Sequence, residues 1–350
     1  MLRLQDGKQL SDLERVASGI MGKLIDGIWH DIWYETSSSA GRFVREDASF
    51  RHWIRPADDL STPNQNVFTA EENRYHLYVS YACPWAHRTL IFRKLKGLES
   101  LISVSVVHYF MGASGWTFEM GPGVIPDSQL GAQFLYEVYT RAKPNYTGRV
   151  TVPILWDKQL KTIVNNESSE IIRMFNSAFD ELGAAPGNYY PPELGAEIDA
   201  LNERIYHSLN NGVYRCGFAT TQVAYSEALK SLFETLDWLE DRLAKQRYLC
   251  GHRITEADWR LFTTLIRFDA VYVGHFKTNL KCLREYPNLF AYTCDLYQIP
   301  GIAETVNMHH IKHHYYESHA TINPTQIVPR GPLLDFDGPH HREMLGASDG

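Results

Sequence analysis

Between residues 73 and 180, hydrophobic positions alternate between the spacing of strands and the spacing of helices. β-branched and aromatic residues in "HLYVSYA" (76–82) and "LISVSVVHYF" (101–110) predict two buried strands. "WAHRTLIFRKLKG" (85–97) between them has helical spacing and ends at a glycine, so a right-handed crossover would make the strands parallel. "VTVPILWD" (150–157) and "KTIVNN" (161–166) predict a hairpin.

Helical patterns dominate the rest of the chain. A helix is predicted over 167–179, and the later segments with apolar residues at helical spacing are 191–209, 225–244, 254–272 and 286–319. The change from an α/β pattern to an all-helical pattern places a domain boundary near residues 182–193.

The predicted organisation therefore has four parts. An N-terminal arm (1–70) has a short helical start and loops rich in Ser, Gly, Pro and Asn, and is expected to lie on the body of the protein. An α/β domain (71–185), which contains a long insertion before its hairpin, precedes an all-helical domain (186–335). A C-terminal tail (336–350) carries little signal.

Composition excludes several classes of protein. The chain is 44% hydrophobic and 21% charged with a net charge of -7, which is typical of a soluble globular protein and argues against a nucleic-acid partner. No apolar run approaches the ~20 residues of a membrane span, and the first residues lack the apolar core of a secretory signal. The five cysteines are widely spaced, which argues against disulfides or a zinc site and predicts a cytoplasmic location.

Cys83 is the first candidate for chemistry, because it stands between a predicted strand and a predicted helix. Pro84 after it occupies the position that begins a helix, where its missing N–H costs nothing. A thiol at a helix N-terminus is expected to titrate well below the free value of ~8.5. A buried, inert cysteine is the alternative interpretation.

Two further segments could complete a binding site. Pro153 within "VTVPILWD" fits either a strand-start proline or a cis bond that leaves the preceding backbone free to pair with an extended ligand. In "NNESSE" (165–170), Ser168 or Ser169 could cap a helix whose N–H groups accept a carboxylate, and Glu167 could pair with an ammonium group. A plain capping sequence is the alternative for this segment.

Two motifs are assigned structural roles. Thr255 and Asp258 have the spacing of a capping box before a helix. The pairs His309 with His313 and His310 with His314 have the i, i+4 spacing of metal ligands. Neither histidine pair has an evident third ligand, so solvated or hydrogen-bonded histidines are favoured and no metal is expected.

In this order, these motifs resemble the glutathione transferase superfamily and, more closely, the glutathionyl-hydroquinone reductases of its xi class. The segments that carry the resemblance are "SYACPWAHRTLIFRKLKGLE" (80–99), "GWTF" (115–118), "NESSEIIR" (166–173), "NNGVYRCGFAT" (210–220) and "HYYESHATINPTQIVP" (314–329). The resemblance implies a thioredoxin-like domain followed by an all-helical domain. It also implies glutathione as co-substrate and a homodimer.

The resemblance also implies roles for individual residues. Cys83 would be the catalytic thiol, and Tyr214 and Tyr315 would face the quinol ring and hydrogen-bond its oxygens. The residues that would hold glutathione are Trp116, Arg149, Val152, Glu167 and Ser168. For both tyrosines, a buried ring with a satisfied hydroxyl is the alternative.

The expected reaction is the reduction of a glutathionyl-hydroquinone through a mixed disulfide between Cys83 and glutathione. No second cysteine follows in "CPWA", so external glutathione must resolve the disulfide. One alternative is an omega-like transferase that reduces dehydroascorbate or mixed disulfides, and another is a non-enzymatic binding protein on the same fold.

Overall fold

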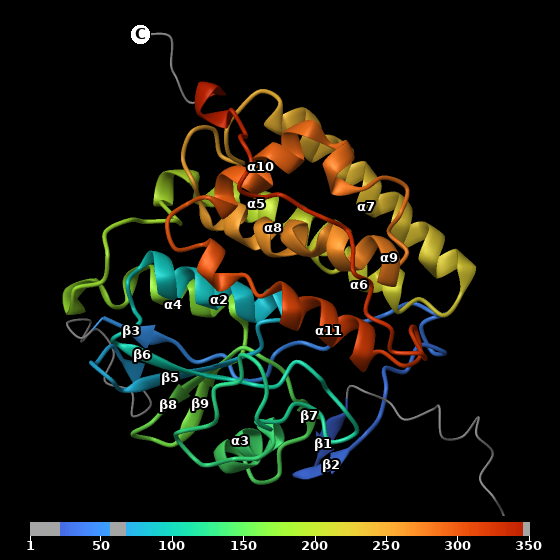
Figure 1. The fold of residues 1–350 in the computed structure, drawn as a ribbon. Coiled ribbons are helices and arrows are strands. Elements are labelled where there is room, and N and C mark those ends of the chain that lie inside the picture. Colours follow the sequence, from blue (N-terminus) through green and yellow to red (C-terminus); the bar gives the residue numbers. More distant parts are fainter. Residues whose placement is uncertain (1–21, 57–67, 346–350) are drawn as a thin grey trace, which may run out of the picture.

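The chain forms a four-stranded mixed sheet next to a larger helical region, as a computed structural model describes it for residues 22–56 and 68–345 (Figure 1). The helical start expected for the arm lies outside these residues. The strands of the sheet, in spatial order, are β6 (Ile102–Val106), β5 (Tyr75–Val79), β8 (Ile154–Asp157) and β9 (Thr162–Asn165). β5 and β6 are parallel and β8 and β9 form an antiparallel hairpin, so both predicted pairings are confirmed.

Helices cover both faces of this sheet. α2 (Pro84–Leu95) and α4 (Ser168–Ser177) lie between the sheet and the helical region, whereas α3 (Leu135–Ala142) lies on the opposite face (Figure 1). The predicted helices over 85–97 and 167–179 correspond to α2 and α4. α3 falls in the segment described only as a long insertion, and its apolar positions are buried against the core.

The helical region contains the helices that the periodicity predicts and two short ones that it does not. The long ones are α5 (Gly195–Ile205), α7 (Gln222–Leu243), α8 (Glu256–Arg267), α10 (Pro287–Tyr297) and α11 (Met308–Ser318). α6 (Gly212–Gly217) and α9 (Val273–His275) are short, and π-helical turns at Tyr206–Asn210 and Phe268–Tyr272 continue α5 and α8. Glycines at both ends of α6 make its helix propensity poor, so its packing against α7 sustains it.

The N-terminal arm contains strands where its composition suggested loops. β1 (Lys23–Ile25) pairs with β2 (Ile28–His30) and with β7 (Gly148–Arg149), which joins the arm to the α/β domain. β3 (Ile54–Arg55) and β4 (Phe68–Thr69) form a separate parallel pair. Strand pairs as short as these give weak local signals, because their stability comes from burial in the assembled fold.

Two strand ends differ from the prediction. β5 stops at Val79 and β6 stops at Val106, three and four residues earlier than the apolar runs suggested. After β5 the chain turns through Ser80, whose carbonyl oxygen accepts from the N–H of Cys83 at 3.2 Å. The turn brings Cys83 to the start of α2.

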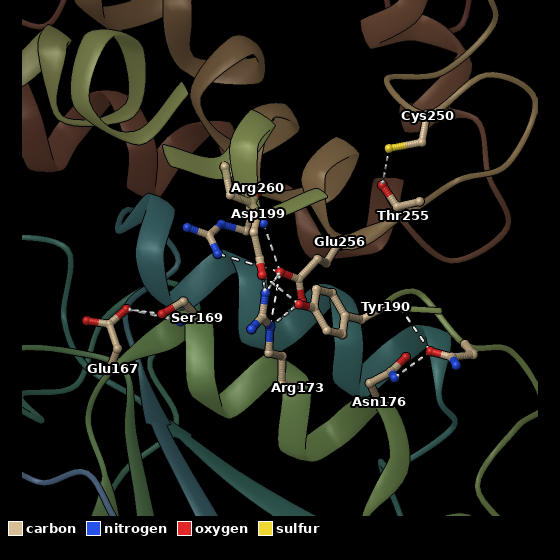
Figure 2. A network of polar contacts seen from close by, with 12 residues as sticks. Glu167, Ser169, Arg173, Asn176, Tyr190, Asp199, Cys250, Thr255, Glu256 and Arg260 are labelled. Atoms are coloured by element: carbon tan, nitrogen blue, oxygen red, sulfur yellow. Dashed lines mark hydrogen bonds and ion pairs between the residues drawn. The ribbon is translucent and has the colours of Figure 1, made fainter. Parts of the chain in front are cut away.

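An ionic network connects the two domains (Figure 2). The Arg173 guanidinium of α4 lies 2.8 Å from Glu256 of α8 and 2.6 Å from Asp199 of α5. Glu256 is buried and also accepts from the side chain of Asn202 at 2.9 Å. A buried carboxylate needs such partners because desolvation of an unpaired charge costs several kcal/mol.

The capping box of α8 is formed as the sequence predicted. The Asp258 carboxylate accepts from the N–H of Thr255 at 2.8 Å and from its hydroxyl at 3.1 Å. The carboxylate also accepts from Leu249 N–H and from the Tyr292 hydroxyl, both at 2.8 Å. Asp258 therefore connects the start of α8 with a preceding loop and with α10.

In the segments 22–56 and 68–345, none of the helices is long and apolar enough to cross a membrane.

Replacing Asp258 by alanine is expected to lower the free energy of unfolding by at least about 3 kcal/mol, because four buried donors lose their acceptor. Thr255→Ala, which removes only the hydroxyl of the cap, should cost about 1 kcal/mol. Urea denaturation followed by circular dichroism measures both values. The control is the exposed Asp241→Ala, with an effect within about 0.5 kcal/mol. An Asp258→Ala effect as small as that of the control would contradict this role.

Candidate functional site

Cys83 is the N-cap residue of α2, with extended backbone angles, and Pro84 occupies the first helical turn. The half-buried Cys83 side chain therefore lies next to the free N–H groups of that turn. Its Sγ is 3.6 Å from the carbonyl oxygen of Val152. The Val152–Pro153 bond is cis, one of the two geometries considered for this proline, and Pro153 directly precedes β8.

The expected lowering of the Cys83 pKa is wrong. Burial raises the pKa of this thiol, and this effect outweighs the N–H groups of Ala86 and Trp85 and the guanidinium groups of Arg267 and Arg45, all of which lower it. The sequence indicated the helix N-terminus but not the desolvation, which depends on side chains from distant segments. These two N–H groups and two guanidinium groups still favour the thiolate form of Cys83, which is the form that acts as a nucleophile.

Cys83 opens into an apolar cavity between the two domains. Of the predicted residues, Trp116, Val152, Tyr214 and Tyr315 line it together with Cys83. The other lining residues, none of which was predicted, are Tyr34, Arg45, Trp85, Val150, Thr151, Phe218, His314 and His319. The aromatic walls suit a flat, apolar ligand.

A second, more polar hollow adjoins the first. It is lined by the predicted residues Arg149, Val152, Glu167 and Ser168. Arg45, Trp85, Thr151 and Val152 line both spaces. One extended ligand could therefore reach from the polar hollow to the sulfur of Cys83.

Glu167, rather than Ser168 or Ser169, is the N-cap of α4. Its carboxylate accepts from the N–H of Ser169 at 3.1 Å and from the hydroxyl of Ser169 at 2.9 Å. Ser168 is buried, and its hydroxyl lies 3.4 Å from the Arg88 guanidinium. The negative charge of Glu167 thus stands at a helix N-terminus that also faces the polar hollow.

Two predicted glutathione contacts have neighbours that the sequence did not indicate. Arg149 donates to the carbonyl oxygens of Ile32 at 2.5 Å and Trp33 at 3.2 Å, and so holds the N-terminal arm. Trp116 lines the apolar cavity and not the polar hollow, with its ring stacked on His314 at a centroid distance of 4.7 Å. The structure therefore places Trp116 beside Cys83 and away from Glu167.

Tyr214 and Tyr315 are brought together by the helical domain. Their hydroxyl groups are 2.5 Å apart, and the hydroxyl of Tyr272 lies 3.2 Å from that of Tyr315. Burial is the main cause that raises the pKa of all three, to well above 10 for Tyr214 and Tyr315. The hydroxyls stay protonated at neutral pH and are available as hydrogen-bond donors.

Two residues that sequence reasoning missed are prominent at the site. Arg45 of the N-terminal arm lies 5.0 Å from the ring centroids of both Trp85 and Tyr214, and donates to Asn211 at 3.0 Å. Tyr272 is the second, and it forms the tyrosine group together with Tyr214 and Tyr315 through the hydroxyl contacts given above. No periodicity marks Arg45, and nothing distinguishes Tyr272 from the other members of a set of 20 tyrosines.

Arg267 of α8 fixes the turn that carries Cys83. Its buried guanidinium donates to the carbonyl oxygens of Ala82 at 2.9 Å and Tyr81 at 3.0 Å. It also lies 3.0 Å from Nδ1 of His87, whose Nε2 is 2.8 Å from the Thr305 hydroxyl. An arginine of the helical domain therefore sets the position of the thiol of the α/β domain.

The histidines of α11 make structural contacts. Nε2 of His310 lies 2.5 Å from the Pro122 carbonyl oxygen, and Nδ1 of His314 lies 2.8 Å from that of Tyr109. His313 pairs with Glu317 at 2.6 Å. Within the part of the chain that the structure describes, no group of three or more potential ligands could hold a metal ion. All five cysteines fall in this part, and all are free.

Known proteins match nearly the whole chain. Residues 82–178 match the glutathione S-transferase N-terminal domain and residues 222–293 the C-terminal domain. The chain is 56% identical over 325 residues to the glutathionyl-hydroquinone reductase YqjG of Escherichia coli (strain K12), covering 93% of this chain and 99% of that protein. It is 57% identical over 318 residues to the glutathionyl-hydroquinone reductase PcpF of Sphingobium chlorophenolicum, covering 91% and 98%.

The glutathione-bound structure of YqjG superimposes with a TM-score of 0.84, at 55% identity, over 92% of this chain and 99% of that one. The expected thioredoxin-like domain and all-helical domain are thereby confirmed. The sequence identity and the shared fold together place this chain in the glutathione transferase family, within the group of the glutathionyl-hydroquinone reductases.

Proposed function

We propose that the chain reduces glutathionyl-hydroquinones to hydroquinones at the expense of glutathione, with Cys83 as the nucleophile. The observation that carries this proposal is the position of Cys83 between an apolar cavity with tyrosine hydroxyls and a polar hollow with Glu167. A substrate in which a sulfur atom joins an aromatic ring to glutathione fits these two spaces. Its ring would lie in the apolar cavity and its glutathione in the polar hollow, so that its sulfur would lie at Cys83.

In the first half-reaction, the Cys83 thiolate attacks the sulfur atom that joins glutathione to the ring. An S–S bond forms between Cys83 and glutathione while the bond between sulfur and the ring carbon breaks. The electron pair of that bond stays with the ring, and the ring carbon gains a proton in place of sulfur. The ring is reduced by two electrons, and the two sulfurs are oxidised to a disulfide.

In the second half-reaction, glutathione thiolate attacks the glutathione sulfur of this disulfide. Oxidised glutathione leaves, and the Cys83 thiolate returns. A second molecule is required because Ala86 stands three residues after Cys83 and α2 (Pro84–Leu95) contains no cysteine that could resolve the disulfide. The cycle is a two-step exchange in which the hydroquinone leaves before the second glutathione reacts.

The proposed contacts to glutathione follow from the polar hollow. Glu167 would pair with the ammonium group of the γ-glutamyl end, and Ser168 and the N-terminus of α4 would hold its carboxylate. The backbone of Val152 would pair with the cysteinyl unit, with Arg149 and Trp116 on either side of it. The Tyr214 and Tyr315 hydroxyls would donate to the oxygens of the ring.

The tyrosine group favours this function over that of an omega-like transferase that reduces dehydroascorbate. Dehydroascorbate is small and polar, whereas the cavity at Cys83 has walls of Trp116, Phe218 and several tyrosines. Rates on a glutathionyl-hydroquinone and on dehydroascorbate separate the two reactions. A non-enzymatic binding protein would show neither turnover.

We also propose a homodimer in the cytoplasm, with glutathione and its hydroquinone conjugates as ligands and no bound metal. The proposed parts of the chain are the arm (1–70), the glutathione-binding domain (71–185), the helical domain (186–335) and the tail (336–350). Size-exclusion chromatography with light scattering measures the oligomeric state.

Cys83→Ser is expected to lower turnover of glutathionyl-menadiol at least about 10³-fold, because a serine hydroxyl is not ionised at neutral pH. Chromatographic detection of the released menadiol measures the rate. Cys282→Ser, which changes a half-buried thiol that does not line the cavity, should keep the wild-type rate. If Cys83→Ser turned over like the control, Cys83 would not be the nucleophile.

Tyr315→Phe is expected to reduce kcat on glutathionyl-menadiol about 10- to 100-fold, and Tyr214→Phe somewhat less. The hydroxyl of Tyr315 contacts two other hydroxyls, so its loss disturbs the whole group. Steady-state kinetics separates kcat from KM, and Tyr297→Phe in α10 is the control. Unchanged kcat in both active-site variants would exclude a role for these hydroxyls in the reaction.

A further inference from the structure

His314 lies in the wall of the apolar cavity that contains Cys83. It belongs to α11, is 6% exposed, and its ring stacks on that of Trp116. The spacing in "HHIKHH" predicts a solvated or hydrogen-bonded histidine here, and within residues 22–56 and 68–345 only Nδ1 of the ring has a hydrogen-bond partner.

The hydrogen bond of Nδ1 defines the protonation of the ring. The nearest partner of Nδ1 is the Tyr109 carbonyl oxygen, at 2.8 Å. A carbonyl oxygen only accepts, so Nδ1 carries the hydrogen in the neutral imidazole and Nε2 carries a lone pair. His314 therefore has a fixed orientation, and its basic Nε2 has no hydrogen-bond partner among the residues that the structure describes.

The proposed reaction requires a base at this place. Cleavage of the carbon–sulfur bond leaves an electron pair on the ring, and a ketone form of the ring accepts such a pair far better than the aromatic form. Conversion of a hydroquinone to its ketone form removes a hydroxyl proton and adds a proton to the carbon that bears sulfur. A group in the cavity must accept the hydroxyl proton.

The other polar groups of the cavity do not suit this task. Tyr34, Tyr214 and Tyr315 are protonated donors, and Arg45 is cationic. His319 has no fixed tautomer, because its Nδ1 lies 3.0 Å from Nε2 of the buried His275 and either nitrogen can be the donor. Cys83 is consumed as the nucleophile. His314 remains as a neutral base with a defined lone pair.

We propose that His314 is the catalytic base that converts the bound glutathionyl-hydroquinone to its ketone form. This inference rests on the proposed function. Nε2 takes the proton of one ring hydroxyl, while the sulfur-bearing carbon receives a proton that comes ultimately from solvent. Cys83 then takes the glutathione sulfur, the carbon–sulfur electron pair forms the ring oxyanion, and His314 returns its proton to that oxygen.

The step leaves the charge of His314 unchanged over one half-reaction. One proton leaves the ring oxygen and comes back, and the single proton consumed stays on the ring carbon. Burial lowers the pKa of His314 to about 4, so the imidazole is neutral at neutral pH and its Nε2 lone pair is available. The same shift makes it a weaker base than a free imidazole, so the proton transfer depends on stabilisation of the ring oxygen that loses the proton. The tyrosine hydroxyls would stabilise the oxyanion that forms while His314 holds the proton.

The two half-reactions supply the test, because only the first involves the ring. Enzyme mixed with glutathionyl-menadiol without free glutathione should release one menadiol and form the Cys83–glutathione disulfide, measured by rapid quench and mass spectrometry. His314→Gln is expected to slow this step about 10²-fold or more. Reduction of the preformed disulfide by glutathione should stay within about twofold of the wild-type rate.

His310→Gln is the matched control, since it changes another buried histidine of α11 that contacts a backbone carbonyl but does not line the cavity. It should leave both half-reactions near the wild-type rates. Imidazole added to His314→Ala should restore part of the first half-reaction only.

Two results would overturn the assignment of His314: an unchanged first half-reaction in His314→Gln, or equal slowing of both half-reactions. Failure of the wild-type enzyme to release menadiol would instead refute the proposed function, and with it this inference.

Discussion

Arg267 holds the turn before Cys83 against the helical domain, and the geometry of the site depends on this contact. Its guanidinium reaches the carbonyl oxygens of Tyr81 and Ala82 from α8, while Cys83 itself caps α2. Both carbonyl groups belong to the turn that follows β5, where the chain has left the sheet. They therefore accept hydrogen bonds from Arg267 and not from a neighbouring strand. A buried arginine requires such acceptors, and the turn requires such a donor. The position of the thiol is therefore a property of both domains.

The burial of Cys83 between the two domains has opposing effects on the chemistry of its thiol. Burial raises the pKa of the thiol, yet it also strengthens every nearby charge and dipole, including Arg45, Arg267 and the N–H groups of α2. Burial likewise keeps the tyrosine hydroxyls protonated and His314 neutral. A cavity closed by aromatic side chains thus sets the protonation state of each group that lines it.

Much of the fold could be predicted from sequence because long apolar patterns are local. The parallel strands, the hairpin, the helices around residues 171, 232 and 261, and the capping box of Asp258 all follow from spacing and end signals. α3, α6 and the strands of the arm could not, because their residues have weak intrinsic preferences and are held by tertiary contacts. The N-cap of α4 was also misplaced, by one or two residues.

The sequence by itself determined that a lone cysteine begins a helix beside a Val-Pro step and a Glu-Ser helix start, and its motifs indicated the family. Only the tertiary structure decided what surrounds that cysteine. Arg45, Arg267, Tyr272 and His314 come from segments up to about 230 residues away from it, and each is an ordinary residue in its local pattern. Periodicity reports which side of an element is buried, whereas the identity of the groups that meet across a cavity depends on how the elements pack.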